Sequence, residues 1–320
     1  MIKGTFLDEI SHDIPHQNWG RKEWDNDFKL MKDMGIELVI MIRSGYKKWI
    51  TYPSDVLESE MGAFRPSTDL LKMFLELSEK YGLQFYFGLY DSGKYWVNGD
   101  YDEEVAINKA VIDEVWKNYG NYPAFKGWYI SHEISRNNNP AIKLFSLLGN
   151  YCKTLSNGLP TMISPYIDGV KNISQYNNEI NRTTGVSLET HQAEWRQIFQ
   201  EIQGAIDIVA FQDGHVAYDE LIDFLKVNKT LAEEFGLECW TNTESFDRDM
   251  PIKFLPIKWD KLELKLDLAK KAGIEKAITF EFSHFMSPQS SYLQAGHLYN
   301  RYQEYRKLKF NFYLSGDEDF

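Results

Sequence analysis

The chain has little of what would place it in several large classes of protein. It has two cysteines in 320 residues, Cys152 and Cys239, and they do not form a closely spaced pair. We therefore expect two buried thiols and neither a disulfide nor a zinc site. No apolar run is long enough to span a bilayer, and a formal net charge of -12 opposes binding to nucleic acid or to anionic lipid. We expect no nucleic-acid partner and no membrane partner.

The N-terminus also lacks a signal peptide, because an apolar segment with the composition of a strand begins at Ile2. The cytoplasm is therefore the default expectation, and a periplasmic or secreted location applies if a leader was removed. Nothing in the sequence bears on the oligomeric state.

Eight short apolar segments alternate with eight amphipathic ones. The short segments are rich in Ile, Val, Phe, Tyr and Trp, as strands buried on both faces should be. They are residues Ile2–Leu7, Leu38–Ile42, Gln84–Leu89, Gly127–Ser131, Thr161–Ser164, Ile208–Phe211, Glu238–Thr243 and Lys276–Phe282. Eight strand–helix units predict an α/β fold, a single (β/α)8 barrel over residues 1–320. An open, doubly wound sheet is the alternative, but no G-x-G-x-x-G motif follows the first strand.

The segments that follow strands are often long, whereas those that follow helices are short. The longest are residues 44–66, 91–101, 166–188 and 246–258. In a barrel all strand-to-helix loops emerge at the C-terminal face, where active sites lie. Loops of this length are otherwise uncommon in compact domains, so they predict a site elaborated at that face.

Polar residues gather where the predicted strands end. They are Asp8, Glu9, His12, Arg43, Tyr90, Asp91, His132, Glu133, Ser164, Tyr166, Gln212, Asp213, His215, Asn242, Glu244, Glu281 and His284. One such residue is ordinary where a strand meets water. A ring of carboxylates, histidines and one arginine at all eight strand ends indicates a site for charge chemistry.

Two glutamates stand out in this ring. Glu133 follows the fourth strand and shares a face with Tyr129 and Ser131, while Glu244 follows the seventh strand and shares a face with Asn242. These strands lie across a barrel from each other, so the two carboxyl groups can approach one bond from opposite sides. Glycoside hydrolysis requires that arrangement.

The neighbours of the two glutamates indicate their roles. Arg43 is expected to keep Glu244 ionised, whereas Glu133 has no obvious cation and is expected to keep a raised pKa. His132 is expected to hydrogen-bond substrate. Aromatic residues in the long loops suit sugar rings, whose C–H faces stack on aromatic side chains. They are Trp49, Tyr52, Tyr95, Trp96 and Tyr166.

On these residues the chain resembles a clan A glycoside hydrolase. That clan has an acid/base glutamate after strand four, a nucleophile glutamate on strand seven and an arginine at the end of strand two, which match Glu133, Glu244 and Arg43. More closely, GTFLDEI, QNWG, EWD and MKDMGIELVIMIRSGY resemble a little-characterised family of bacterial barrels, mostly from Bacteroidetes, described as glycoside hydrolases. Two positions depart from the clan, since His132 replaces an asparagine and FEFSHF replaces a strand-eight tryptophan.

The resemblance implies a retaining glycosidase that acts on an oligosaccharide or polysaccharide without a cofactor. The expected substrate-binding residues are Asp8, Arg43, Trp49, Tyr90, Asp91, Trp96, His132, Tyr166, Gln212, Asp213, Asn242, Glu281 and His284.

Three alternatives remain open. The first is a metal-dependent sugar isomerase or lyase, with ligands from Glu133, Asp213, Glu244, Glu281 and His284. The second is a carbohydrate-binding barrel without catalysis. The third keeps the glycosidase but makes Glu281 the second carboxylate in place of Glu244, because Glu281 shares a face with Ala277 and Thr279 and on this hypothesis also points inward.

Overall fold

The computed structural model describes residues 1–11, 14–137, 139–171, 185–248 and 254–315, without the side chains of residues 139 and 309–315. His12 and parts of the predicted loops at 166–188 and 246–258 lie outside the described residues.

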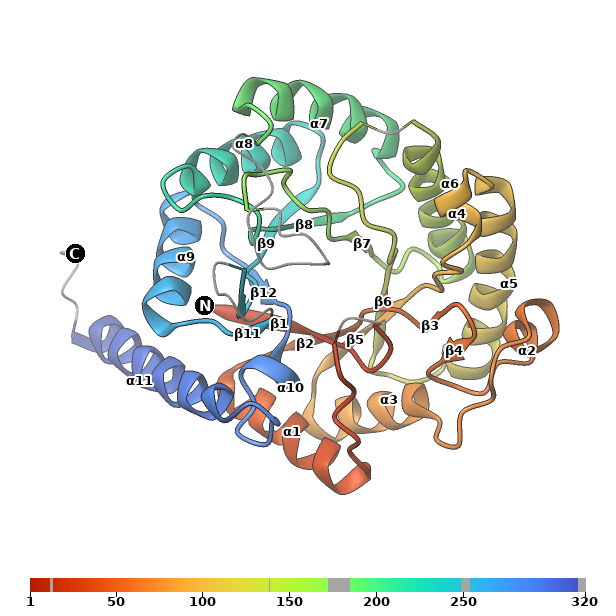
Figure 1. Ribbon diagram of the computed structural model, residues 1–320, viewed down its shortest axis with the longest axis horizontal. Coiled ribbons are helices and arrows are strands. Elements are labelled where there is room, and N and C mark those ends of the chain that lie inside the picture. The colour runs from red at the N-terminus through yellow and green to blue at the C-terminus, as the bar shows by residue number, and fades with distance from the viewer. Residues whose placement is uncertain (12–13, 138, 172–184, 249–253, 316–320) are drawn as a thin grey trace.

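Eight parallel strands close into a barrel with the helices outside it (Figure 1). Their order around the barrel is β1-β12-β9-β8-β7-β6-β5-β2, so strands that follow one another in the chain are neighbours. The strands are β1 (Ile2–Leu7), β2 (Leu38–Met41), β5 (Gln84–Gly88), β6 (Phe125–Tyr129), β7 (Thr161–Ile163), β8 (Ile208–Gln212), β9 (Glu238–Asn242) and β12 (Ala277–Thr279). The predicted (β/α)8 barrel is confirmed.

Among the described residues, eight long helices surround the strands. They are α1 (Arg21–Met34), α3 (Leu70–Tyr81), α5 (Tyr101–Tyr119), α6 (Asn139–Leu155), α7 (Leu188–Ile202), α8 (Leu221–Glu234), α9 (Trp259–Lys271) and α11 (Leu293–Ser315). The Asp69 side chain accepts a hydrogen bond from the Lys72 backbone at 2.9 Å and so starts α3, which ends at Gly82 in the left-handed conformation. In the part of the chain that the structure describes, no helix has the length and apolar character needed to cross a membrane.

Shorter elements lie in the strand-to-helix loops. They are the hairpin of β3 (Gly45–Tyr46) and β4 (Trp49–Ile50), the hairpin of β10 (Phe246–Asp247) and β11 (Leu255–Pro256), and the helices α2 (Asp55–Met61), α4 (Tyr95–Asn98) and α10 (Phe282–Phe285). Each is inserted after a barrel strand, at its carboxyl end. The predicted elaboration of that end is confirmed for the described residues.

The inside of the barrel is a packed core of alternate strand residues. Its buried members are Phe6, Leu38, Ile40, Ile42, Tyr86, Tyr129, Met162, Ile208, Ala210, Trp240 and Ile278. Gly127 belongs to this inner layer, because a Cβ atom there would lie 2.6 Å from the Tyr86 ring. The residues between them, such as Trp128 and Ile130, pack outward against the helices. Residues that follow the inner positions past the strand ends therefore reach the barrel mouth.

Several predicted boundaries and one burial prediction need correction. β6 begins at Phe125, two residues before the predicted start, because that ring packs against Trp128 at a centroid distance of 4.9 Å. β12 ends at Thr279, since the chain turns into α10 at Phe282. Cys152 is buried as predicted, but Cys239 is partly exposed, so the prediction of a second buried thiol is wrong. That residues 1–320 form one domain stays a prediction.

Candidate active site

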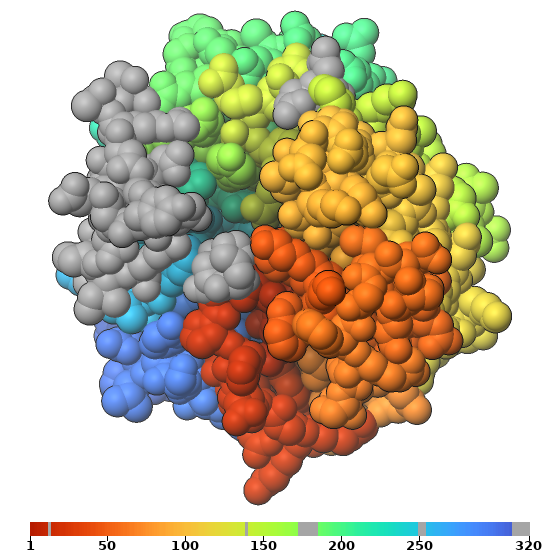
Figure 2. Space-filling view, turned by 45° about the vertical axis from the view of Figure 1, so that its right-hand side comes forward, coloured from red at the N-terminus to blue at the C-terminus, as the bar shows by residue number. Residues whose placement is uncertain are grey.

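A cavity opens at the carboxyl end of the barrel, on a face whose centre is hollowed (Figure 2). Its lining comes from strand ends and from the loops that follow them. The lining residues are Phe6, Ser11, Ile14, Ile42, Arg43, Glu133, Gln212, Asn242, Glu244, Phe246, Arg248, Phe254 and Phe280. The two predicted catalytic glutamates therefore face one cavity.

Glu133 lies four residues beyond the end of β6, on the predicted face. Tyr129 belongs to the inner core while Trp128 and Ile130 pack outward, which confirms the predicted alternation of this segment. Burial raises the pKa of Glu133, and this effect outweighs the lowering by Arg43, by a hydrogen bond from Gln212 and by Arg248. The predicted raised pKa is confirmed, but the prediction that Glu133 lacks a nearby cation is wrong.

Glu244 is held by an arginine that the sequence did not point to. Its carboxylate is 2% exposed and accepts two hydrogen bonds from Arg248, one from Nε and one from Nη2, both at 2.8 Å. Burial alone would raise the pKa of Glu244, but Arg248 and then Lys265 bring it below its usual value. Glu244 is therefore a carboxylate at neutral pH, whereas burial favours the protonated form of Glu133.

Arg248 is itself fixed by the hairpin that carries it. Its guanidinium lies 4.9 Å from the centre of the Phe246 ring and 5.9 Å from that of Phe254. Contacts of this kind attract a cation to the face of an aromatic ring. The backbone of Gly214 lies against the Glu244 carboxylate, so closely that a Cβ atom there would lie 1.6 Å from Glu244 Oε2. The Glu244 carboxylate thus fits between an arginine and a stretch of backbone without a side chain.

A second ion pair holds the backbone of Glu244. Asp213 and Lys265 lie 2.6 Å apart and are almost completely buried. Asp213 accepts a hydrogen bond from the Glu244 N–H at 3.1 Å, and Lys265 donates one to the Glu244 carbonyl at 3.0 Å. Asp213 does not line the cavity. The sequence predicted that it binds substrate, whereas in the structure it contacts Glu244.

Arg43 does not have the partner predicted for it. Its Nη1 atom lies 3.2 Å from Asp91 Oδ2, and its charge acts on Glu133 and Asp91. The prediction that Arg43 keeps Glu244 ionised is therefore wrong, because Arg248 has that position. The period-two pattern of a strand could not reveal Arg248, which follows the two-residue strand β10.

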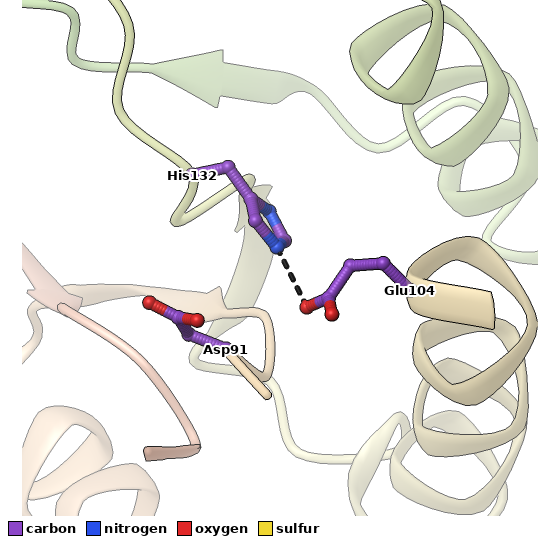
Figure 3. Close-up of side chains that lie close together, drawn as sticks. All are labelled: Asp91, Glu104 and His132. Atoms are coloured by element: carbon purple, nitrogen blue, oxygen red, sulfur yellow. Dashed lines mark hydrogen bonds and ion pairs between the residues drawn. The ribbon is translucent and has the colours of Figure 1, made fainter. Parts of the chain in front are cut away.

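His132 turns away from the cavity toward Glu104 of α5, with His132 Nε2 and Glu104 Oε1 2.9 Å apart (Figure 3). Asp91 lies beside them, and within the described residues these three form the one group with the spacing of metal ligands. We call this group the Glu104 network. Both carboxylates already accept hydrogen bonds. Asp91 accepts from Arg43, Trp96 and the backbone of Gly93. Glu104 accepts from Ser92 and Asn108 and also faces His132. A cation there would have to displace N–H donors and share Asp91 with an arginine.

Glu281 and His284 form a buried ion pair. Both side chains are fully buried, and they bond to each other. Glu281 also accepts the backbone N–H groups of Ser283 and His284, which starts α10. Burial alone would lower the pKa of His284, but the Glu281 carboxylate raises it to about 9.

Glu281 lies on the outer face of its segment. Ala277 packs outward, whereas Ile278 belongs to the inner core and Phe280 lines the cavity. The prediction that the face of Glu281 points inward is therefore wrong, and Glu281 does not line the cavity that Glu133 and Glu244 share. The ligand set proposed for a metal site is not brought together either, because Glu281 pairs with His284 outside the cavity lining.

Five of the predicted site residues line the cavity. They are Arg43, Glu133, Gln212, Asn242 and Glu244. The others lie outside its lining, and for them substrate binding stays a prediction without support from the cavity. They are Asp8, Trp49, Tyr90, Asp91, Trp96, His132, Tyr166, Asp213, Glu281 and His284.

The predicted aromatic residues occupy several different environments. Trp49 is 63% exposed and packs on Phe64, and Tyr90 is buried with its hydroxyl donating to a backbone carbonyl. Trp96 donates to Asp91 at 2.8 Å, and Tyr166 packs edge-on against His215. The aromatic wall of the cavity consists of phenylalanines that the sequence reasoning missed, although Phe6 and Phe280 lie on inner positions of predicted strands.

The geometry defines a class: a (β/α)8 barrel with two glutamates of opposite pKa shift at its carboxyl end. Within that class, the chain belongs to the family described as Domain of unknown function (DUF4434), whose model matches residues 2–292. No curated protein matches the chain.

One similar solved structure is that of a protein from Bacteroides thetaiotaomicron VPI-5482, described as a putative alpha-L-fucosidase. It is 62% identical, with a TM-score of 0.90 over 95% of this chain and 92% of that chain. The endo-1,4-beta-D-mannanase from Thermotoga petrophila RKU-1 is 13% identical, with a TM-score of 0.55 over 88% and 87%. A glycoside hydrolase family 5 protein from Bacteroides vulgatus ATCC 8482 is 13% identical, with a TM-score of 0.56 over 83% and 56%. The last two similarities bear on the fold alone.

Proposed function

We propose that the chain is a retaining glycoside hydrolase in which Glu133 is the acid/base and Glu244 the nucleophile. The observation that carries this proposal is that both glutamates line one cavity while their pKa values shift in opposite directions. Pairs of carboxyl groups with opposite shifts divide into an acid and an ionised partner. No cofactor is needed, and the substrate is a carbohydrate.

In the first step Glu133 transfers its proton to the glycosidic oxygen while the Glu244 carboxylate attacks the anomeric carbon. The C–O bond to the leaving group breaks, and a glycosyl ester forms on Glu244. In the second step the Glu133 carboxylate takes a proton from water, whose oxygen attacks the same carbon and releases Glu244. Arg248 keeps Glu244 ionised before the first step, and the Asp213–Lys265 pair holds the backbone of Glu244 in place.

The two sides of the cavity suggest the kind of sugar. Neighbouring strands β2, β1 and β12 lead to an apolar side with Ile42, Phe6 and Phe280, which the hairpin extends through Phe246. The Phe6 and Phe280 rings lie 5.9 Å apart, and the Phe280 and Phe246 rings 6.1 Å apart. The polar residues Glu133, Gln212, Asn242 and Glu244 come from β6, β8 and β9 or follow these strands, and Arg43 follows β2.

A sugar with one apolar edge, such as a 6-deoxyhexose with its methyl group, fits such a cavity. The description of the 62% identical relative as a putative alpha-L-fucosidase supports the same choice. We therefore propose an α-L-fucoside, or another 6-deoxyhexoside, as the substrate.

The test is hydrolysis of aryl α-L-fucosides and a panel of other aryl glycosides by the wild type and two isosteric variants. Glu244→Gln should abolish turnover. Glu133→Gln should lose about 10²- to 10⁴-fold on substrates with poor leaving groups and much less on dinitrophenyl glycosides, which need no acid. A Glu244→Gln variant with wild-type rates would refute the assignment, and sugar binding without turnover by the wild type would favour a binding protein.

A further inference from the structure

The side chain of Asn242 has one atom that the fold leaves unused. Asn242 is the last residue of β9, is 2% exposed and lines the cavity. Its Oδ1 atom has no hydrogen-bond partner among the described residues. Buried polar atoms are almost always paired, so an unpaired acceptor in the wall of a cavity calls for an explanation.

The orientation of this amide is fixed by its neighbours. Asn242 Nδ2 donates to Ser164 Oγ at 3.1 Å, and Ser164 Oγ donates to the carbonyl of Ala210 at 2.8 Å. A hydroxyl has one hydrogen, so Ser164 can only accept from Asn242. The amide nitrogen must therefore face Ser164, which leaves the oxygen as the group that Asn242 offers to a ligand.

The neighbouring amide of Gln212 provides a contrast. Its Nε2 atom donates to the carbonyl of Ser164 at 2.7 Å, and the side chain also bonds to Glu133. Gln212 is thus engaged within the site, although it lines the same cavity and faces inward like Asn242.

A second unpaired group lies in the same lining. Arg43 Nε is buried and has no hydrogen-bond partner in the described part of the chain. Among the buried side-chain atoms of the described lining residues, Asn242 Oδ1 is thus a free acceptor and Arg43 Nε a free donor. Sugar hydroxyls can satisfy both, because each hydroxyl donates one hydrogen bond and accepts others.

We infer that Asn242 Oδ1 accepts a hydrogen bond from one hydroxyl of the bound sugar, and that Asn242 is a specificity-determining residue whose orientation Ser164 maintains. The inference rests on the proposed function, because it concerns the sugar on which Glu244 acts. Asn242 and Glu244 are two residues apart on one face, so the hydroxyl belongs to the ring that Glu244 attacks. A sugar that lacks this hydroxyl leaves the buried acceptor unpaired and binds less tightly.

The experiment measures binding, not turnover, by titration calorimetry with L-fucose, D-mannose, D-galactose and D-glucose. The sugar that binds best is then compared with its monodeoxy analogues. For the wild type, we expect removal of one hydroxyl to weaken binding by about 10- to 100-fold. In Asn242→Leu the parent sugar should bind as weakly as that analogue, and the difference between them should disappear.

Two further variants keep the test decisive. Thr241→Val is the matched control, because Thr241 is the adjacent buried residue with an unpaired hydroxyl but does not line the cavity. It should discriminate as the wild type does. Ser164→Ala frees the amide of Asn242 to rotate, so it should discriminate less than the wild type even if Asn242→Leu fails to fold.

The inference is overturned if Asn242→Leu keeps the wild-type discrimination, if no analogue differs from its parent sugar, or if no sugar of the panel binds. Binding with the expected discrimination but without hydrolysis of any glycoside refutes the proposed chemistry alone.

Discussion

Replacing Arg248 by methionine tests how the site keeps Glu244 ionised. The change removes two hydrogen bonds of 2.8 Å and the cation closest to a carboxylate that is 2% exposed. An opposite charge in contact lowers a carboxyl pKa by about 1 to 3 units, which corresponds to about 1.4 to 4 kcal/mol. Without Arg248, burial prevails and the pKa of Glu244 should rise by about that amount.

The assay is the pH dependence of kcat/KM for the glycoside on which the wild type is active. Since the nucleophile must be ionised, the acid limb of the profile should move up by about 1 to 3 pH units in Arg248→Met. At a pH below both limbs the variant should be about 10- to 1000-fold slower. Arg248→Lys, which keeps the charge but not the paired geometry, should move the limb less.

Arg43→Met is the matched control, since Arg43 also lines the cavity but acts on Glu133. Its loss should raise the pKa of the acid and move the alkaline limb upward, while the acid limb stays in place. An acid limb that moves in Arg43→Met and not in Arg248→Met would refute the assignment of the two arginines. A folded Arg248→Met protein with an unchanged profile would do the same.

Three other predictions concern the surroundings of the site. Gly214→Ala should displace the Glu244 carboxylate, because the new Cβ atom would lie 1.6 Å from Oε2. We expect kcat to fall by about 100-fold while circular dichroism shows an intact fold. A wild-type rate would contradict this. The raised pKa of His284, about 9, means that its pairing with Glu281 stabilises the fold fully below pH about 6.5 and is lost as the pH rises through about 9. Chemical denaturation should therefore show a decrease in unfolding free energy of at most about 3 kcal/mol over that range, and a smaller decrease in His284→Gln. EDTA should leave activity unchanged, because the carboxylates of the Glu104 network already accept hydrogen bonds from other groups. A loss of activity that one divalent metal restores would contradict this.

The barrel could be predicted from the sequence because its signals are repeated eight times. Continuous apolar strands, amphipathic helices and short helix-to-strand turns all favour the same fold, and each of the eight strands overlaps its predicted range. The boundaries were less certain. Phe125 extends β6 through contacts with aromatic residues that come together only in the folded barrel.

The two catalytic candidates could also be predicted, since Glu133 and Glu244 continue the inner faces of their strands. The period-two pattern identifies two faces but does not say which is the inner one, and so Glu281 was assigned to the wrong face. Arg248 was missed because it follows a hairpin inserted after β9, where no regular period holds. The orientation of His132 depends on Glu104, which is 28 residues away in α5.

The most direct test of the central claim is to trap the covalent intermediate. In a 2-deoxy-2-fluoro glycoside the fluorine slows both steps, while a dinitrophenyl leaving group speeds the first step again, so a retaining enzyme accumulates as its glycosyl ester. After incubation with the fluoro glycoside of the sugar that the wild type prefers, mass spectrometry of peptides should find one fluoroglycosyl group on Glu244. A label on another carboxylate, or hydrolysis with inverted configuration and no label, would contradict the account.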